Sequence, residues 1–572
     1  MRGLGCMRLS EHDAGRALAT LHAALDAGFA LLDTADVYFG ADGRTGDNER
    51  LVARALATWT GDRSSVIVAT KGGLTRESQR WQPDGRAKHL QAACAQSAEA
   101  LGVERIDLYL LHAVDPRTPL ATSVRALARL QRQGRVRDIG LCNVTLGQLR
   151  EAEDIAPIAA VQVALNPFQD DALRNGVAEH CAARDIRLIA HTPLGGPSKA
   201  PRLQRDPVLA EIAQRLGATP VTVVLAWLAS LGENVVAIPG ATRPETAAAD
   251  LPTLGAREQR ELEARFPTST VLRVPRARRR PAADAEGDVV LLMGYPGGGK
   301  STLARSYEER GYVRLNRDRV GGRLADLIPQ LDEGLAQGDR RFVLDNTYAS
   351  RASRNAVLET AWRHHVPVRC VWLQTSLEDA QINAVQRMLA QRGRLLEPDE
   401  IRKASRTNPN IFAPEAQFRY RRELETPQLE EGFASLEVKA FERRRAAGTN
   451  RALIVEHELL TADRRTLLER YRNDGWLLLG LAWLPGWTSE AAEAHAQSLT
   501  ARAGLPIEFL VCRHEAGPPK CWCRKPLPGR GVVFIERHAL DPARCVHVGR
   551  NATDRLFAER LGFAYLDADA WC

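Results

Sequence analysis

A glycine-rich stretch in the middle of the chain constrains its fold more than any other feature. Residues 294–302 read Gly-Tyr-Pro-Gly-Gly-Gly-Lys-Ser-Thr and fit G-x-x-x-x-G-K-[ST] at every fixed position. The apolar run Val289–Met293 predicts a strand before it, and the residues from Leu303 onward predict a helix. This order predicts a phosphate-binding loop, because glycines let backbone N–H groups turn toward phosphate oxygens beside a helix N-terminus.

Single residues of this loop have predicted roles. Lys300 is expected to reach the β- and γ-phosphates of ATP or GTP, and Ser301 is expected to bind Mg²⁺. The residues expected to hold the nucleotide are Gly294, Gly297, Gly299, Lys300, Ser301 and Thr302. The alternative is a glycine-rich turn that binds nothing. The agreement of the loop with its flanking elements favours the nucleotide site.

The chain is too long for a single hydrophobic core. Its 572 residues predict three or four domains. A net charge of +8 is compatible with a polyanionic partner but does not require one. The apolar run 476–487 is interrupted by Gly480 and Pro485 and is too short to span a bilayer, and no signal peptide is recognisable. Scattered cysteines suggest a reducing cytoplasm, so we expect a cytoplasmic protein with no membrane partner.

Residues 1–268 alternate short apolar runs with helical patterns. The expected strands are 4–8, 29–34, 66–70, 106–111, 138–143, 160–166, 187–192 and 235–239. This alternation predicts an α/β fold of the (β/α)8 type, a TIM barrel, in which chemistry sits at the C-terminal ends of the strands.

Four polar residues lie at those predicted strand ends: Asp33, Tyr38, Lys71 and His112. A lysine held by a carboxylate lowers the pKa of a nearby phenol, and a neutral histidine can orient a carbonyl oxygen. Any one of these residues alone would be read as barrel scaffold. The four together predict a proton donor at the mouth of the barrel.

With these residues in place, nearly all of residues 1–268 resembles the aldo-keto reductase superfamily. The resemblance implies that Tyr38 is the general acid, that Lys71 and Asp33 tune it, and that His112 positions the carbonyl of a small aldehyde. The residues that it assigns to an NADPH cofactor are Asn143, Gln162, Thr192, Leu194, Gly240, Thr242 and Arg243. Arg243 is available for the 2′-phosphate, whereas His191 replaces the tyrosine that stacks on the nicotinamide in relatives.

A basic segment, residues 269–287, separates this domain from the next. It shows no periodicity and predicts an exposed, semi-extended linker. The alternative is a contact with nucleic-acid phosphates.

Residues 288–447 form the predicted P-loop NTPase α/β domain. A strand that ends in Asn316-Arg317-Asp318 places a carboxylate near the γ-phosphate, where it can take a proton from an acceptor alcohol. Asp345 ends another strand and can hold the water shell of a metal or the incoming substrate. Arg387 lies on a predicted lid helix, where a guanidinium can neutralise a transferring phosphoryl group.

This set resembles the polynucleotide 5′-hydroxyl kinase branch of the P-loop kinases. The resemblance implies that Asp318 is the general base toward a 5′-hydroxyl end of DNA or RNA and that Arg387 is the lid arginine. It places Arg317, Asp345 and Asn346 at the substrate. Gly321 stands where some relatives carry an arginine that grips the neighbouring phosphate. The alternative is a P-loop hydrolase without an alcohol acceptor.

Residues 448–572 predict a smaller α/β domain with four soft metal ligands. Cys512 and His514 form C-x-H, and Cys521 and Cys523 form C-x-C. Together they predict a closed tetrahedral Zn²⁺ site; the alternative is four unrelated residues.

The residues that follow, including Lys525, resemble the zinc-bearing haloacid-dehalogenase (HAD-like, Rossmannoid) phosphatases that act on histidinol phosphate and heptose bisphosphate. The catalytic positions depart from that family. Glu456 replaces the aspartate nucleophile, Ala482 replaces a threonine, and Arg550 replaces an aspartate, which puts a positive charge where a metal would bind. We therefore expect a non-catalytic domain that keeps zinc as a structural ion.

Three functions compete at this stage. The first is nucleic-acid end healing or repair by a kinase and a reductase. The second is small-molecule metabolism by a reductase fused to a sugar or cofactor-fragment kinase. In the third, the C-terminal domain is a docking module for repair proteins.

Overall fold

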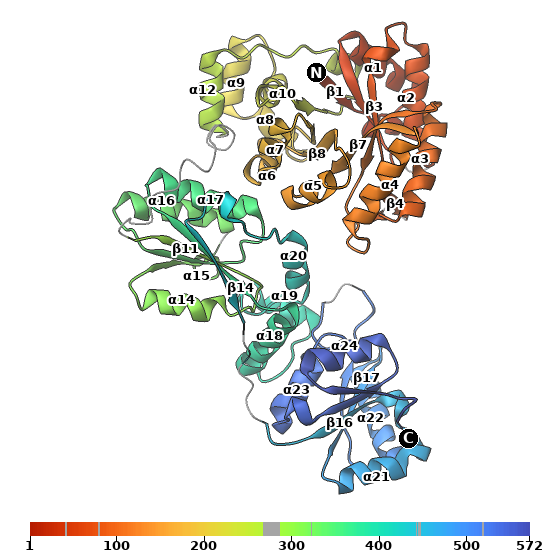
Figure 1. Ribbon diagram of the computed structural model, residues 1–572, viewed down its shortest axis with the longest axis vertical. Coiled ribbons are helices and arrows are strands. Elements are labelled where there is room, and N and C mark those ends of the chain that lie inside the picture. Colours follow the sequence, from red (N-terminus) through yellow and green to blue (C-terminus); the bar gives the residue numbers. More distant parts are fainter. Residues whose placement is uncertain are drawn as a thin grey trace. The chain divides into compact units, whose positions relative to one another are not determined.

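The chain folds into two compact units, Met1–Pro275 and Arg276–Cys572. The computed structural model describes residues 1–39, 43–77, 80–266, 287–321, 323–441, 443, 448–517 and 520–571, coloured along the sequence in Figure 1. All of the predicted linker 269–287 except Gly287 lies outside these residues.

An eight-stranded parallel sheet forms the centre of the first unit (Figure 1). In sheet order the strands are β1 (Arg2–Gly5), β2 (Phe29–Asp33), β3 (Ile67–Gly72), β6 (Ile106–Leu111), β7 (Val136–Cys142), β8 (Ala160–Ala164), β9 (Arg187–His191) and β10 (Val235–Ala237). β1 also contacts β10, and the Gly5 N–H donates to the Pro239 carbonyl at 3.0 Å, which closes the sheet. The predicted (β/α)8 barrel is confirmed.

Helices surround this barrel. They are α1 (Ala14–Asp26), α2 (Asp47–Thr58), α3 (Ala87–Leu101), α4 (Leu120–Arg132), α5 (Leu146–Glu153), α6 (Asp171–Arg174), α7 (Val177–Ala183), α8 (Ala200–Gln204), α9 (Pro207–Arg215), α10 (Pro220–Ser230), α11 (Pro244–Ala247) and α12 (Ala256–Arg265). Inside the barrel, apolar side chains from consecutive strands, such as Leu31, Leu108 and Ile189, pack into a separate buried cluster. A hairpin that the sequence pattern did not predict, β4 (Leu74–Glu77) and β5 (Arg80–Pro83), follows β3.

The second unit contains two five-stranded parallel sheets. The first has the order β12 (Val313–Leu315), β13 (Phe342–Asp345), β11 (Val289–Met293), β14 (Val368–Gln374) and β15 (Ser435–Ala440). Its helices are α14 (Lys300–Glu308), α15 (Arg317–Val320), α16 (Ile328–Ala336), α17 (Arg351–Arg363), α18 (Leu377–Arg392), α19 (Pro398–Ala404) and α20 (Glu415–Glu423). The central strand β11 is buried along its whole length, because helices cover both faces of a parallel sheet.

The second sheet of this unit has the order β18 (Glu508–Cys512), β17 (Leu477–Trp483), β16 (Ala452–Glu456), β19 (Val546–Gly549) and β20 (Ala564–Asp567). The helices around it are α21 (Arg465–Asn473), α22 (Ser489–Ala503), α23 (Gly529–His538) and α24 (Ala552–Leu561). Chain order reverses at β16, so the C-terminal ends of β16 and β19 form a crevice of the kind that holds ligands in open α/β sheets.

Helix α18 packs against the C-terminal half of this unit. Ile382, Val385 and Met388 on α18 pack in one buried cluster with residues that include Trp522 and Phe534 of the C-terminal half. Figure 1 shows α18 beside α23, which it contacts.

Among the residues that the structure describes, no single helix is long and apolar enough to cross a membrane. Within these described residues, α9 and α10 together have the length and composition of a membrane span, but they are bent by 90° relative to each other.

Candidate active sites and candidate metal centre

The ends of β2, β3 and β6 bring together the four polar residues predicted at the mouth of the barrel. Lys71 Nζ donates to Asp33 Oδ2 at 2.8 Å and to Tyr38 Oη at 3.2 Å. Lys71 also donates to the Thr34 carbonyl at 2.8 Å, a partner that the sequence analysis missed. His112 Nε2 lies 3.5 Å from Tyr38 Oη. A chain of polar contacts therefore runs from Asp33 through Lys71 and Tyr38 to His112.

Burial shifts the pKa values of the residues in this series of contacts. It disfavours the charged form of Lys71, but the Asp33 carboxylate and Tyr38 outweigh that effect, so the pKa of Lys71 is raised. Burial raises the pKa of Tyr38 to about 12, and Lys71 opposes this rise without cancelling it. The expectation of a net lowered phenol pKa is therefore wrong for the protein alone. Burial and the charge of Lys71 hold the pKa of His112 well below its usual value, so its imidazole is neutral.

Two predicted cofactor residues make different contacts here. Gln162 Nε2 donates to Asp33 Oδ1 at 2.6 Å and so helps to orient the carboxylate. Asn143 Oδ1 lies 3.0 Å from His191 Nε2, and Thr192 Oγ1 lies 2.9 Å from His191 Nδ1. Asn143 and Thr192 have φ values of 54° and 52° in the left-handed region. Such strained backbone is common at ligand sites.

The remaining predicted cofactor residues lie nearby in the fold. Leu194, Gly240 and Arg243 line one cavity of about 800 Å³. Thr242 uses its carbonyl to accept from Arg16 Nε at 2.9 Å. Arg243 is exposed at the start of α11, where its guanidinium can meet a phosphate.

Trp81 on β5 also lies at this site and was not predicted from the sequence. Its ring lies edge-on to the rings of Tyr38 and His112, with centroid distances of 6.3 Å and 6.2 Å, and it is 40% exposed. Trp81 therefore forms an apolar wall at the barrel mouth. No motif marks this residue, because it reaches the site through the unpredicted hairpin.

The phosphate loop between β11 and α14 has its glycines where close packing requires them. Gly294, Gly297 and Gly299 have φ values of 151°, 83° and 93°. A Cβ on Gly297 would lie 2.7 Å from the Ala380 carbonyl oxygen. Lys300 Nζ donates to the carbonyls of Gly294 and Tyr295 at 2.9 Å and 2.8 Å, so it folds back over the loop. Ser301 and Thr302, in the first turn of α14, are exposed.

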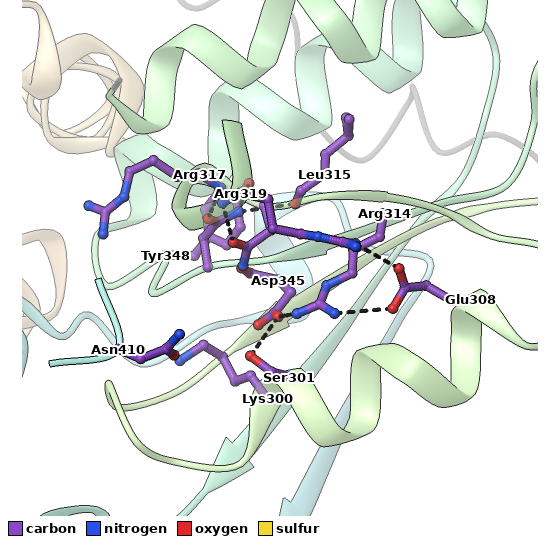
Figure 2. A network of polar contacts seen from close by, with 12 residues as sticks. Lys300, Ser301, Glu308, Arg314, Leu315, Arg317, Arg319, Asp345, Tyr348 and Asn410 are labelled. Carbon is purple, nitrogen blue, oxygen red and sulfur yellow. Dashed lines mark hydrogen bonds and ion pairs between the residues drawn. The ribbon is translucent and has the colours of Figure 1, made fainter. Parts of the chain in front are cut away.

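Figure 2 shows a charged network beside this loop. Asp345 Oδ2 accepts from Ser301 Oγ at 3.0 Å and forms an ion pair with Arg314. Arg314 also pairs with Glu308 Oε2 at 3.1 Å. The serine hydroxyl and the carboxylate thus meet where Mg²⁺ is predicted. Arg314 and Glu308 were not predicted, because a charged residue on a short strand carries no motif.

The predicted base and lid residues surround the same loop. Asp318 Oδ1 accepts from Arg317 Nη2 at 2.8 Å, and the Asp318 side chain is 37% exposed. Asn346 Oδ1 accepts from the Arg317 N–H at 3.0 Å, which fixes the start of α15. Arg387 on α18 donates to Asn410 Oδ1 at 3.0 Å.

Burial lowers the pKa of Lys300 to about 8, against the opposing effect of the Asp345 and Asp318 carboxylates. Arg387 and Arg317 lower it further. These five charges therefore act on one another, and together they form a strongly polar site around the loop.

The four predicted metal ligands come together after β18. The candidate ligand atoms of Cys512, His514, Cys521 and Cys523 all lie within 4.8 Å of one another. His514 Nδ1 lies 3.1 Å from Cys523 Sγ. Three thiols and one imidazole in such a cluster are a donor set suited to Zn²⁺.

A cavity of about 360 Å³ opens above β16 and β19, lined among others by Glu456, Lys525, Arg550 and Asp554. Lys525 Nζ lies 2.6 Å from Glu456 Oε1 and also pairs with Asp554. The Arg550 backbone N–H donates to Asp554 Oδ2 at 2.8 Å. The cation paired with both carboxylates is therefore Lys525, and Arg550 lines the same cavity.

A parallel (β/α)8 barrel with this buried Tyr–Lys–Asp–His set defines an oxidoreductase domain. Residues 3–255 match the model of the "Aldo/keto reductase family". Aldo-keto reductase str7 of Strobilurus tenacellus is 33% identical over 249 residues, which are 38% of this chain and 70% of the relative. Through its N-terminal domain the chain belongs to the aldo/keto reductase family.

Other comparisons cover the same domain or the P-loop. Uncharacterized oxidoreductase C215.11c of Schizosaccharomyces pombe is 29% identical over 249 residues, or 42% of this chain and 77% of the relative. The structure of an aldo-keto reductase from Klebsiella pneumoniae in complex with NADPH aligns at 25% identity, with 46% of this chain and 90% of that one covered and a TM-score of 0.40. Residues 289–406 match the model of an "AAA domain", so this part of the chain is a P-loop-type domain.

Proposed function

We propose that the chain is a bifunctional enzyme: an NADPH-dependent aldehyde reductase and an ATP-dependent kinase for 5′-hydroxyl ends of DNA or RNA, acting in nucleic-acid end healing or repair. The observation that carries the kinase is the convergence of Lys300, Asp318, Asp345 and Arg387 on one phosphate loop.

The barrel residues divide the work of carbonyl reduction. Gln162, Asn143 and Arg243 are placed to hold NADPH, which supplies a hydride when bound. His112, neutral and 3.5 Å from the Tyr38 hydroxyl, is placed to orient the substrate oxygen. Negative charge that develops on that oxygen favours proton transfer from Tyr38, and the Lys71 ammonium stabilises the phenolate left behind.

The P-loop domain contributes the residues of a phosphoryl transfer. Lys300 must leave the carbonyls of Gly294 and Tyr295 to reach phosphate oxygens, and ATP offers it stronger acceptors. Ser301 and Asp345 are the residues that would hold Mg²⁺, which neutralises phosphate charge when bound. Asp318 takes the proton of the attacking hydroxyl, and Arg387 neutralises the transferring group.

We further propose that the C-terminal domain is a HAD-like fold that binds zinc through Cys512, His514, Cys521 and Cys523 and has no phosphatase activity. The support is the ion pairing of Lys525 with Glu456 and Asp554, which places an ammonium group between the two carboxylates of this crevice. Docking of repair proteins on this domain is the third part of the proposal.

A small-molecule acceptor is the second candidate for the kinase. Gly321 has a φ of 85° and carries no side chain. It therefore cannot bind the neighbouring phosphate of a nucleic-acid strand, as an arginine does at this position in some relatives. Arg319 is paired with Glu308 at 2.8 Å in the structure. A fused sugar or cofactor-fragment kinase fits this feature as well.

A phosphate-transfer assay separates the two candidates. The purified chain is incubated with Mg²⁺ and ATP labelled in the γ-phosphate, and either a 5′-hydroxyl oligonucleotide or a panel of nucleosides and sugars. Transfer to the oligonucleotide, lost in Lys300→Ala, is the expected result. Transfer to the small molecules alone would establish the second candidate.

A further inference from the structure

The two ring nitrogens of His514 contact different groups. Its Nδ1 lies 3.1 Å from Cys523 Sγ and 3.6 Å from Cys512 Sγ, within the cluster of candidate metal ligands. Its Nε2 lies 2.7 Å from Oε2 of Glu397, a residue 117 positions earlier in the chain. Glu397 directly precedes α19 and belongs to the P-loop half of the second unit.

We propose that the zinc site is shared between the two halves of this unit, with Glu397 as the outer carboxylate that orients His514. A metal-binding histidine usually donates its second N–H to a carboxylate, which fixes the tautomer and makes the ligand nitrogen more basic. Nδ1 is then free of a proton for the metal, and Nε2 carries the proton that Glu397 accepts. The inference rests on the proposed zinc site and assigns a residue that the cysteine–histidine spacing alone cannot reveal.

The packing around the metal ligands also connects the two halves of the unit. Trp522 stands between the ligands Cys521 and Cys523 and is only 1% exposed. Its Nε1 donates to the Phe412 carbonyl at 3.0 Å, and its ring lies edge-on to that of Phe412 at 6.1 Å. The metal-binding loop is therefore anchored to the P-loop half at Trp522 as well as at His514.

These contacts between the two halves lie close to the lid helix α18, which packs in one buried cluster with Trp522. Asn383 on α18 donates to the Gly297 carbonyl of the phosphate loop at 2.9 Å. On the same helix, Gln386 donates to Glu536 of α23 at 2.7 Å, and Gln381 accepts from Arg560 of α24 at 3.1 Å. A metal that fixes the C-terminal half thereby also supports the helix that carries Arg387.

Zinc affinity of the full-length protein tests the shared site. We expect Glu397→Ala to release zinc to a competing chromogenic chelator with an affinity about 10–100-fold weaker than wild type. Glu397→Gln keeps the size and one acceptor and should fall in between. Asp399→Ala is the matched control, because Asp399 lies two residues further on, is 79% exposed and pairs only with Arg402 of the same helix among the described contacts.

Hydrogen exchange gives a second readout. Chelation of zinc from the wild-type protein should speed exchange in 377–392 as well as in 508–523. Equal zinc affinity in wild type and Glu397→Ala, or exchange confined to 508–523, would overturn the shared site while leaving the four-ligand zinc site intact. Absence of zinc from the purified wild-type protein by elemental analysis would overturn both.

Discussion

The ammonium nitrogen of Lys71 lies 3.2 Å from the phenol oxygen of Tyr38 and 2.8 Å from a carboxylate oxygen of Asp33. All three side chains are nearly or fully buried. The charge of Lys71 is thereby fixed next to the only atom of Tyr38 that can release a proton. In the proposed mechanism, the acid function of Tyr38 therefore depends on Lys71.

Replacement of Tyr38 by phenylalanine removes the acid and keeps the ring. We expect the turnover of simple aromatic aldehydes to fall by about 10²–10⁴-fold, while NADPH binding, followed by fluorescence titration, is retained. Tyr109→Phe is the control, because Tyr109 is a fully buried tyrosine of the same barrel whose hydroxyl has no hydrogen-bond partner among the described residues. Equal turnover in Tyr38→Phe and wild type would show that another group donates the proton.

The position of Arg243 leads us to expect that the protein prefers NADPH to NADH. Its guanidinium is exposed, and we propose that it binds the 2′-phosphate that only NADPH carries, as a charge-assisted contact. Arg243→Ala should raise the dissociation constant for NADPH about tenfold or more and change that for NADH little. Equal effects on both cofactors, measured in the same titration, would place the 2′-phosphate elsewhere.

Much of the barrel and its four polar site residues could be predicted from the residue pattern alone. The predicted strand 106–111 matches β6 at both ends, and Val289–Met293 matches β11, because short apolar runs bounded by polar residues are buried parallel strands. The four residues at the barrel mouth could be found for the same reason. Strand ends are defined by the pattern, and the barrel brings those ends together.

Other contacts depend on packing that no local pattern encodes. Glu397 meets His514 only because α18 and α19 pack on the C-terminal half. Arg314 looks like an ordinary polar residue of a short strand until β12 and β13 place it beside Asp345. Burial likewise reverses the expected direction of the Tyr38 pKa, since the sequence shows the nearby charge but not the loss of water.

The lowered pKa of Lys300 predicts a pH dependence of ATP binding. In the free protein burial brings this pKa to about 8, so the amine loses its proton as the pH rises above that value. Phosphate oxygens favour the charged form, and binding above pH 8 must therefore take up a proton. Affinity should be insensitive to this group below about pH 7 and fall by up to about tenfold per pH unit above pH 8.

Calorimetry in buffers of different ionisation enthalpy measures that proton uptake directly. Lys300→Arg keeps a positive charge at all these pH values, so its binding should show no uptake between pH 8 and 10. Proton uptake that persists unchanged in Lys300→Arg would assign the titration to a different residue.

The role of Asp318 provides the sharpest test of the kinase. Its carboxylate accepts from Arg317 at 2.8 Å and is 37% exposed, so an incoming hydroxyl can reach it from solvent. Asp318→Ala removes the proposed base, and transfer to a 5′-hydroxyl oligonucleotide should fall by about 10²–10⁴-fold, a much larger change than the shift in ATP affinity that follows from the altered charge around Lys300. Asp326→Ala is the matched control, since Asp326 is an exposed carboxylate of the same domain that contacts Arg323. Full transfer by Asp318→Ala would refute its assignment as the base, and a parallel loss of ATP binding would make it a nucleotide ligand instead.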